Sequence, residues 1–144
     1  MGTIPAVATI SAGAVVTSTY LNSLKAAIDF WALTPRCYAY QSSTTSPATS
    51  TGTVLPMQAE VYDIVQSGDS PMHDNSTNNS RIYVRTAGKY TISGQVTFAN
   101  NSTGIRQAYV RLNAAGSPGG GSQLTLANAP ALTAVPTSVP IPTV

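Results

Sequence analysis

RIYVRTAGKYTISGQVTFANNSTGIRQAYVRLN, which runs from Arg81 to Asn113, is the most regular stretch of this sequence and the one that best predicts its fold class. Apolar and polar residues alternate through three short blocks in this stretch, and polar turn sequences separate the blocks. A period of two is typical of antiparallel strands that turn one face toward a core and the other toward water. The stretch therefore predicts a meander of three consecutive strands.

The apolar face of the middle block is the predicted centre of the β core. The residues that we expect to be buried there are Tyr90, Ile92, Val96 and Phe98. The third block continues the alternation and places Ala108, Val110 and Leu112 on one face. It stops at a second turn sequence that begins at Asn113.

One helix is predicted ahead of the strands, over residues 17–33. Thr17 or Ser18 can cap its start, and Pro35 disfavours helix at the residue before it. Apolar residues recur in it at spacings of three, four and three, which is typical of a short coiled-coil seam: Leu21, Leu24, Ile28 and Trp31. A helix of this length is marginal in water on its own, so the seam needs a partner. That partner is either the sheet of the same chain or copies of the same helix.

The strand region resembles the jelly-roll domains of the complement globular-head and tumour-necrosis-factor type. The resemblance lies in AGKY at 87–90, the strand ending in Phe98, and the strand from Arg106 that ends in LN at 112–113. RCYAY at 36–40 and VYD at 61–63 lie where such domains carry their first strands. The resemblance implies an antiparallel jelly-roll-like sandwich and a homotrimer. Since the sequence shows fewer strands than a full jelly roll, we expect an incomplete one that neighbouring chains complete or that extends beyond this chain.

The amino-terminal part carries a second resemblance. A leader rich in Thr and Gly, then TSTYLNSLKAAIDFW at 17–31, then PRC at 35–37, is similar to small virion proteins of tailed bacteriophages, particularly those infecting actinobacteria. Together the two resemblances cover residues 10–116. They imply a structural protein that is made in the bacterial cytoplasm and incorporated into a particle.

Composition agrees better with a particle component than with an enzyme. Charged residues make up only 8% of the chain. Ordinary soluble domains contain about 25%. The net charge of +2 gives no argument for nucleic acid. No apolar run approaches the length of a membrane span, which is about 20 residues. We therefore expect neither a nucleic-acid nor a membrane partner.

Cys37 is the only cysteine, which excludes an internal disulfide. It alternates with tyrosines, and this pattern predicts a small buried side chain.

The sequence predicts no catalytic, cofactor or metal site. His73 is the only histidine, and we expect it in a polar loop away from the core, without a nucleophile motif nearby. Glu60 and Asp63 fall on opposite faces of a regular strand, so they are not expected to converge. Asp69, His73 and Asp74 form the one candidate metal cluster, and three ligands among ordinary turn residues are too few.

Four segments follow from this pattern. Residues 1–16 form an extended arm that docks on the particle through Val7, Ile10, Val15 and Val16, and residues 17–33 form the docking or trimerisation helix. Residues 34–128 form the jelly-roll-like β domain. Residues 129–144 are rich in proline and form either a C-terminal arm or an edge strand.

The expected function is that of a bacteriophage virion structural protein, with other capsid or tail proteins as its partners. A homotrimeric capsid-decoration or head-fibre protein is favoured over a tail-fibre or baseplate component because the chain is short. The alternative from another class is a carbohydrate-binding module that attaches the particle to cell-surface glycans. Its candidate contacts are exposed aromatic residues: Tyr38, Tyr40, Tyr62, Tyr83 and Tyr109.

Overall fold

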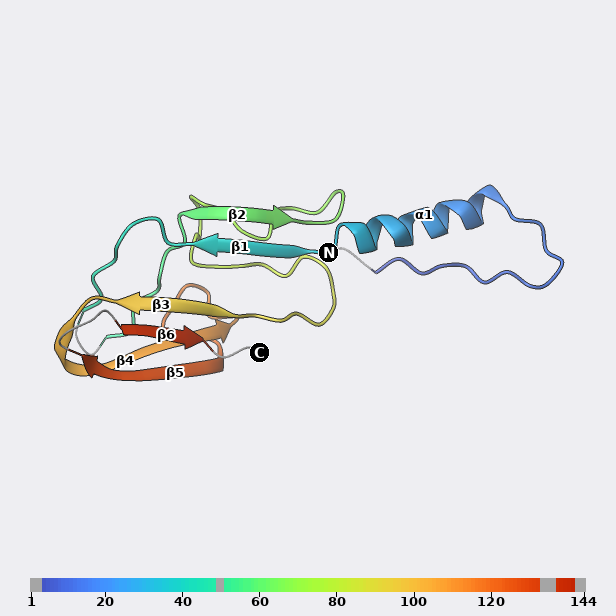
Figure 1. Cartoon of the computed structure of the whole chain (residues 1–144). Helices are drawn as coiled ribbons and strands as arrows, with labels where there is room; N and C mark the ends of the chain where they lie inside the picture. The colour runs from blue at the N-terminus through green and yellow to red at the C-terminus, as the bar shows by residue number, and fades with distance from the viewer. Residues whose placement is uncertain (1–3, 49–50, 133–136, 142–144) are drawn as a thin grey trace. The chain divides into compact units, whose positions relative to one another are not determined.

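The computed structural model describes residues 4–48, 51–132 and 137–141 (Figure 1). The chain is mostly β with one short helix, and this confirms the predicted class. In chain order the elements are α1 (Ser18–Ala32), β1 (Arg36–Tyr40), β2 (Ala59–Ile64), β3 (Gly94–Phe98), β4 (Asn101–Leu112), β5 (Ser122–Leu132) and β6 (Thr137–Ile141). Within the described residues the strands form small antiparallel sheets of two, which are β1–β2, β3–β6 and β4–β5.

The chain forms two compact units. The first consists of Met1–Ala48 and Leu55–Gly88 and contains α1, β1 and β2. The second consists of Thr49–Val54 and Lys89–Val144 and contains β3 to β6. The boundary between the units falls inside the 34–128 segment that the sequence predicts as one β domain.

Helix α1 begins and ends where the sequence predicts. Thr17 has an extended backbone, and its hydroxyl oxygen accepts a hydrogen bond from the Tyr20 N–H at 3.3 Å, which caps the first turn. At the other end the Leu33 N–H donates to the Asp29 carbonyl, shortly before Pro35 makes further helix unfavourable. The predicted helix over 17–33 is therefore confirmed.

The leader turns back and runs alongside α1 (Figure 1). Its reversal is a turn in which the Ala14 N–H donates to the Ser11 carbonyl at 3.1 Å and Gly13 takes a φ of 81°. Farther along, the Ala8 N–H donates to the Ser23 hydroxyl oxygen at 3.4 Å. The buried side chains of α1 are Ala27 and Phe30, which follow Ser23 at helical spacing and share its face.

Strands β1 and β2 form a ribbon with one irregularity. Tyr38 pairs with Tyr62 and Ala39 pairs with Glu60, so Val61 is an extra residue in β2. Such a β-bulge shifts the alternation of the strand beyond it by one residue. As a consequence, Glu60 and Asp63 lie on the same face of the ribbon, and the prediction that they lie on opposite faces is wrong.

The long ribbon of β4 and β5 follows the predicted alternation. Ala108 and Thr125 are buried on one face, whereas Ile105 and Leu126 are exposed on the other. On the exposed face, the Gln107 amide donates to the Asn128 side-chain oxygen across the ribbon at 2.9 Å.

Most side-chain hydrogen bonds to the glycine-rich turn between β4 and β5 come from Arg111. The Arg111 guanidinium lies 5.6 Å from the Tyr109 ring centroid. It also donates to four carbonyl oxygens of the turn, those of Pro118, Gly119, Gly120 and Gly121. Gly121 has a φ of 62°, and a Cβ there would lie 2.0 Å from the Leu112 carbonyl oxygen. This position therefore requires glycine.

The predicted meander does not form. Residues 81–85 of its first block belong to no strand, and β3 begins only at Gly94. Strand β3 then pairs with β6 from the proline-rich tail, not with β4. Pro140 lies opposite Gln95 in this pair, which an edge strand tolerates because it needs no donor on its outer side. Of the two alternatives for the tail, Thr137–Ile141 forms the edge strand.

The described residues bury very few apolar side chains. Those classed as buried are Ala27, Phe30, Met72, Ala108 and Val139. The predicted core residues Tyr90, Ile92, Val96 and Phe98 alternate with exposed neighbours as expected, but each is only half-buried. Among the residues that the structure describes, there is no helix with the length and hydrophobicity that a membrane crossing requires.

Candidate functional site

The predicted helix seam lies open to solvent. All four of its side chains are exposed, from 36% at Leu24 to 75% at Trp31, with Leu21 and Ile28 between them. The buried residues Ala27 and Phe30 lie on the neighbouring face of α1. The helix is thus apolar on two sides, and only one of them is covered by the described residues of its own chain.

The apolar residues of the leader are also exposed. Val7, Ile10, Val15 and Val16, which the sequence predicts as a docking arm, all have open side chains. The leader and the seam therefore present two apolar strips in the same unit. Neither strip is covered by the part of the chain that the structure describes.

Three of the five candidate tyrosines come together on the outer face of the β1–β2 ribbon. We call Tyr38, Tyr40 and Tyr62 the tyrosine surface. The Tyr38 ring centroid lies 6.0 Å from that of Tyr62 and 6.4 Å from that of Tyr40, and the Arg36 guanidinium lies 6.0 Å from the Tyr62 centroid. All three tyrosines are exposed because the small residues between them in β1 occupy the inner face.

The other two tyrosines lie elsewhere. Tyr109 packs under Arg111 and its hydroxyl donates to the Pro118 carbonyl at 3.4 Å, so it stabilises the glycine-rich turn. Tyr83 lines a hollow in the first unit, together with Arg85.

The inner face of the β1–β2 ribbon is organised around His73, which is buried with 3% of its surface exposed. Its backbone N–H donates to Asp63 Oδ2 at 2.9 Å, and its Nδ1 lies 3.4 Å from Glu60 Oε2. Its Nε2 lies 3.1 Å from the Asn79 carbonyl oxygen, which can only accept, so this nitrogen donates. His73 is therefore an anchor that ties the loop over residues 69–86 to β2, and the prediction of a loop residue away from any core is wrong.

The β-bulge at Val61 brings Glu60 to the face that already holds Asp63, which is the face that His73 approaches. Sequence reasoning missed the cluster because it assumed a regular strand. A lone histidine followed by a run of turn residues carries no periodic signal of burial.

Two of the three candidate metal ligands, Asp69 and Asp74, accept hydrogen bonds from other residues of the first unit. Asp69 Oδ2 accepts a hydrogen bond from the Thr86 hydroxyl at 3.2 Å, and Asp74 Oδ1 accepts the N–H groups of Thr77 and Ser76. The N–H group of Thr77 first, and then that of Ser76, hold the pKa of the Asp74 carboxyl below its usual value. In the part of the chain that the structure describes, no group of three or more His, Cys, Asp or Glu side chains is placed to hold a metal ion.

Cys37 is half-buried on the inner face of the ribbon, opposite Asp63. Burial first, and then the charges of Asp63 and Glu60, raise the pKa of its thiol from 9.0 to about 11. The thiol is therefore protonated at neutral pH, and it is a weak nucleophile.

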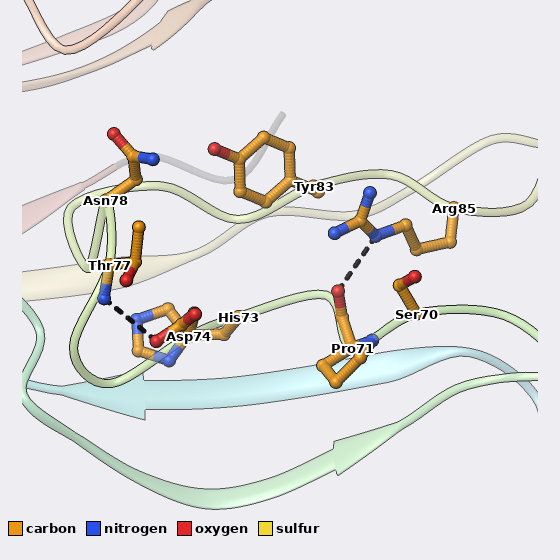
Figure 2. A pocket seen from close by; sticks show the side chains of 8 residues that line it. All are labelled: Ser70, Pro71, His73, Asp74, Thr77, Asn78, Tyr83 and Arg85. Atoms are coloured by element: carbon orange, nitrogen blue, oxygen red, sulfur yellow. Dashed lines mark hydrogen bonds between the residues drawn. The ribbon is translucent and has the colours of Figure 1, made fainter.

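A hollow of about 420 Å³ lies in the first unit beside the His73 loop (Figure 2). It is lined by Ser70, Pro71, His73, Asp74, Thr77, Asn78, Tyr83 and Arg85. Sequence reasoning missed it because its residues come from two segments of irregular backbone, which no periodicity brings together.

No protein-family model, no curated protein and no solved structure matches this chain. Its function is therefore inferred from the residues and surfaces described above.

Replacing His73 by alanine should destabilise the first unit. The substitution leaves a void and removes the donor to the Asn79 carbonyl, so the free energy of unfolding should fall by about 1–3 kcal/mol. Chemical denaturation measures this change. The control is Asn75→Ala, an exposed substitution in the same loop. It should change the free energy of unfolding by less than about 0.5 kcal/mol. Equal effects of the two substitutions would contradict the anchor role.

The Cys37 thiol should react slowly with alkylating reagents while the chain is folded. A pKa of about 11 in place of 9.0 leaves far less thiolate at pH 8 than the unfolded chain has. The expected ratio of the two alkylation rates is up to about a hundredfold. Alkylation with and without concentrated urea, followed by mass spectrometry, measures the difference.

The same experiment has an internal check. Glu60→Gln should speed the reaction of the folded chain, because it removes one of the charges that raise the pKa of the Cys37 thiol. Equal rates in the folded and unfolded chain would show that the thiol is not protected.

Proposed function

We propose that this chain is a non-enzymatic structural protein of a bacteriophage virion, a homotrimeric capsid-decoration or head-fibre protein. The observation that carries the proposal is the exposed apolar seam of α1, formed by Leu21, Leu24, Ile28 and Trp31. The low charge and the resemblance of residues 17–37 to small phage virion proteins also support it.

The seam favours self-association on energetic grounds. Fully burying a large apolar side chain stabilises an assembly by about 1.5–3 kcal/mol, and each copy offers a row of them. Helix α1 has 15 residues. Such a short helix is marginal in water, so contact with equivalent helices also stabilises the helix itself. The spacing of three, four and three suits packing against equivalent helices, and the trimer is the assembly that the jelly-roll resemblance implies.

The same assembly accounts for the small sheets. A two-stranded ribbon is rarely stable alone, and each of its strands has one unpaired edge. We propose that neighbouring copies lie against these edges and complete a jelly-roll-like sandwich. The scarcity of buried apolar residues in the described chain supports this arrangement, because a chain of 144 residues is long enough for a larger core.

In this proposal the leader attaches the trimer to the particle and the strands project from it. The exposed side chains of Val7, Ile10, Val15 and Val16 are the docking contacts, and the partners are capsid proteins. A tail-fibre or baseplate position uses the same contacts with tail proteins as partners. The protein is made in the host cytoplasm and functions in the virion.

Charges placed in the seam should break the assembly. Leu24→Asp with Ile28→Asp would bury two carboxylates at each helix contact, at a cost of several kcal/mol per copy, so the trimer should dissociate. Sedimentation equilibrium at micromolar concentration measures the mass of the wild type and of the variant. Immunogold electron microscopy of intact particles then locates the wild type on head or tail and tests whether the variant still binds.

The matched control is Asn22→Asp, which adds a charge at an exposed polar position of the same helix. It should leave both the trimer and its attachment unchanged. A wild-type chain that sediments as a monomer, or particles that carry no label, would refute the assembly proposal.

The tyrosine surface supports a second candidate, a carbohydrate-binding module for host attachment. Exposed, neighbouring tyrosine rings offer apolar faces for sugar rings and hydroxyls for hydrogen bonds.

For this candidate, a glycan array should show saturable binding that Tyr38→Ala and Tyr62→Ala each reduce by about tenfold or more. Removing a ring loses the apolar contact that it makes with a sugar, and losses of a few kcal/mol are usual for aromatic anchors. Val61→Ala, at the exposed bulge of the same ribbon, is the control. Binding that survives both tyrosine substitutions would reject this candidate.

A further inference from the structure

The hollow beside the His73 loop has two chemically different ends (Figure 2). Arg85 and Ser70 lie at one end, whereas Asp74, Thr77 and Asn78 lie at the other. Tyr83 lies between them on the upper rim of the view, and Pro71 lies on the lower side. The hollow measures about 420 Å³. This volume is in the range of small-molecule sites and suits one sugar ring.

Arg85 is held in place by contacts that leave its outer nitrogens available. Its Nε donates to the Pro71 carbonyl at 2.8 Å, and its guanidinium stacks 4.7 Å from the Tyr83 ring centroid. Its two terminal nitrogens make no hydrogen bond or ion pair with any residue that the structure describes. A guanidinium fixed in this way presents two parallel donors, which is the geometry that binds a carboxylate.

The other end of the hollow presents polar groups and holds no lysine or arginine. Asp74 uses Oδ1 to hold the turn, and its Oδ2 has no hydrogen-bond partner among the described residues. The side chain of Thr77 lies near it, and that of Asn78 lies at the same end of the hollow, above Thr77 in the view. An acceptor carboxylate with a neighbouring hydroxyl and amide suits the hydroxyl groups of a sugar.

We propose that this hollow binds an acidic sugar of the uronic acid type, with its carboxylate on Arg85 and its hydroxyls on Asp74 and Asn78. The ring lies between Tyr83 and Pro71. A phosphate group fits less well, because its second negative charge meets Asp74. Arg85 is the only arginine of the lining, which contains no lysine.

This site is separate from the surfaces discussed above, and it does not depend on the assembly role. None of its lining residues belongs to the helix seam or to the tyrosine surface. A failed test of trimerisation, or of glycan binding at the tyrosine surface, would therefore not decide whether this hollow binds a ligand.

The test is a titration of the whole chain by isothermal calorimetry or NMR with three probes. Glucuronate carries both the carboxylate and the hydroxyls, glucose carries only hydroxyls, and acetate carries only the carboxylate. Glucuronate should bind saturably and at least about tenfold more tightly than either of the other probes, because it alone contacts both ends. Equal affinities for the three probes, or no saturable binding of glucuronate, would overturn the proposal.

Two substitutions locate the ends of the site. Arg85→Gln should weaken glucuronate binding by about tenfold or more, because it removes a charged donor pair. Asn78→Gly should weaken glucuronate but leave acetate unchanged. Glycine is the suitable replacement because Asn78 has a φ of 54°, which glycine accepts without strain.

Arg36→Gln is the matched control, since Arg36 also lies over a tyrosine ring in the same unit but outside the hollow. It should leave glucuronate affinity unchanged. A loss as large as that of Arg85→Gln would show that binding is general attraction to surface arginines and would overturn the site. Circular dichroism of each variant establishes that it is folded before titration.

Discussion

A strand in a two-stranded ribbon has a neighbour on one side only, so the N–H and C=O groups of its other edge need water, a loop or another chain. All three sheets in the described residues are of this kind. Such ribbons are stabilised by what packs on their faces, and only a few apolar side chains of the described residues are buried. Helix α1 has a similar uncovered surface, because the side chains of its apolar seam are exposed. Both features support the proposed assembly with other copies of the chain.

Within the first unit, a single extra residue in β2 places two carboxylates on the same face of the ribbon. The bulge at Val61 brings Glu60 and Asp63 to one face, and His73 then anchors the following loop on that face. Large rings are left on the other face, where they form the tyrosine surface. The same anchored loop forms the wall of the hollow that contains Arg85. The bulge thus adds Glu60 to the anchor, whereas Asp63 and the tyrosine surface follow from the regular pairing of Cys37 with Asp63 and of Tyr38 with Tyr62.

In the second unit, side-chain hydrogen bonds fix the turn and the exposed face of the β4–β5 ribbon. The Arg111 guanidinium donates hydrogen bonds to four carbonyl oxygens of the glycine-rich turn. The Gln107 amide donates to the Asn128 side-chain oxygen across the exposed face of the β4–β5 ribbon. Hydrogen bonds to charged donors stabilise by about 1.5–3 kcal/mol, more than those between neutral groups. Such contacts position a ribbon without covering its apolar residues, and Ile105 and Leu126 accordingly stay exposed.

The local features of this protein could be predicted from residues that are close together in the chain. The cap at Thr17, the stop before Pro35 and the apolar spacing of the seam predicted α1, and the period of two predicted the alternation along β3 and β4. Other features exist only in the folded chain. Strand β3 pairs with the tail, Glu60 and Asp63 converge on His73, and the hollow brings Arg85 and Asn78 together. Each of these depends on a partner farther along the chain or on a bulge, and neither leaves a periodic trace in the sequence.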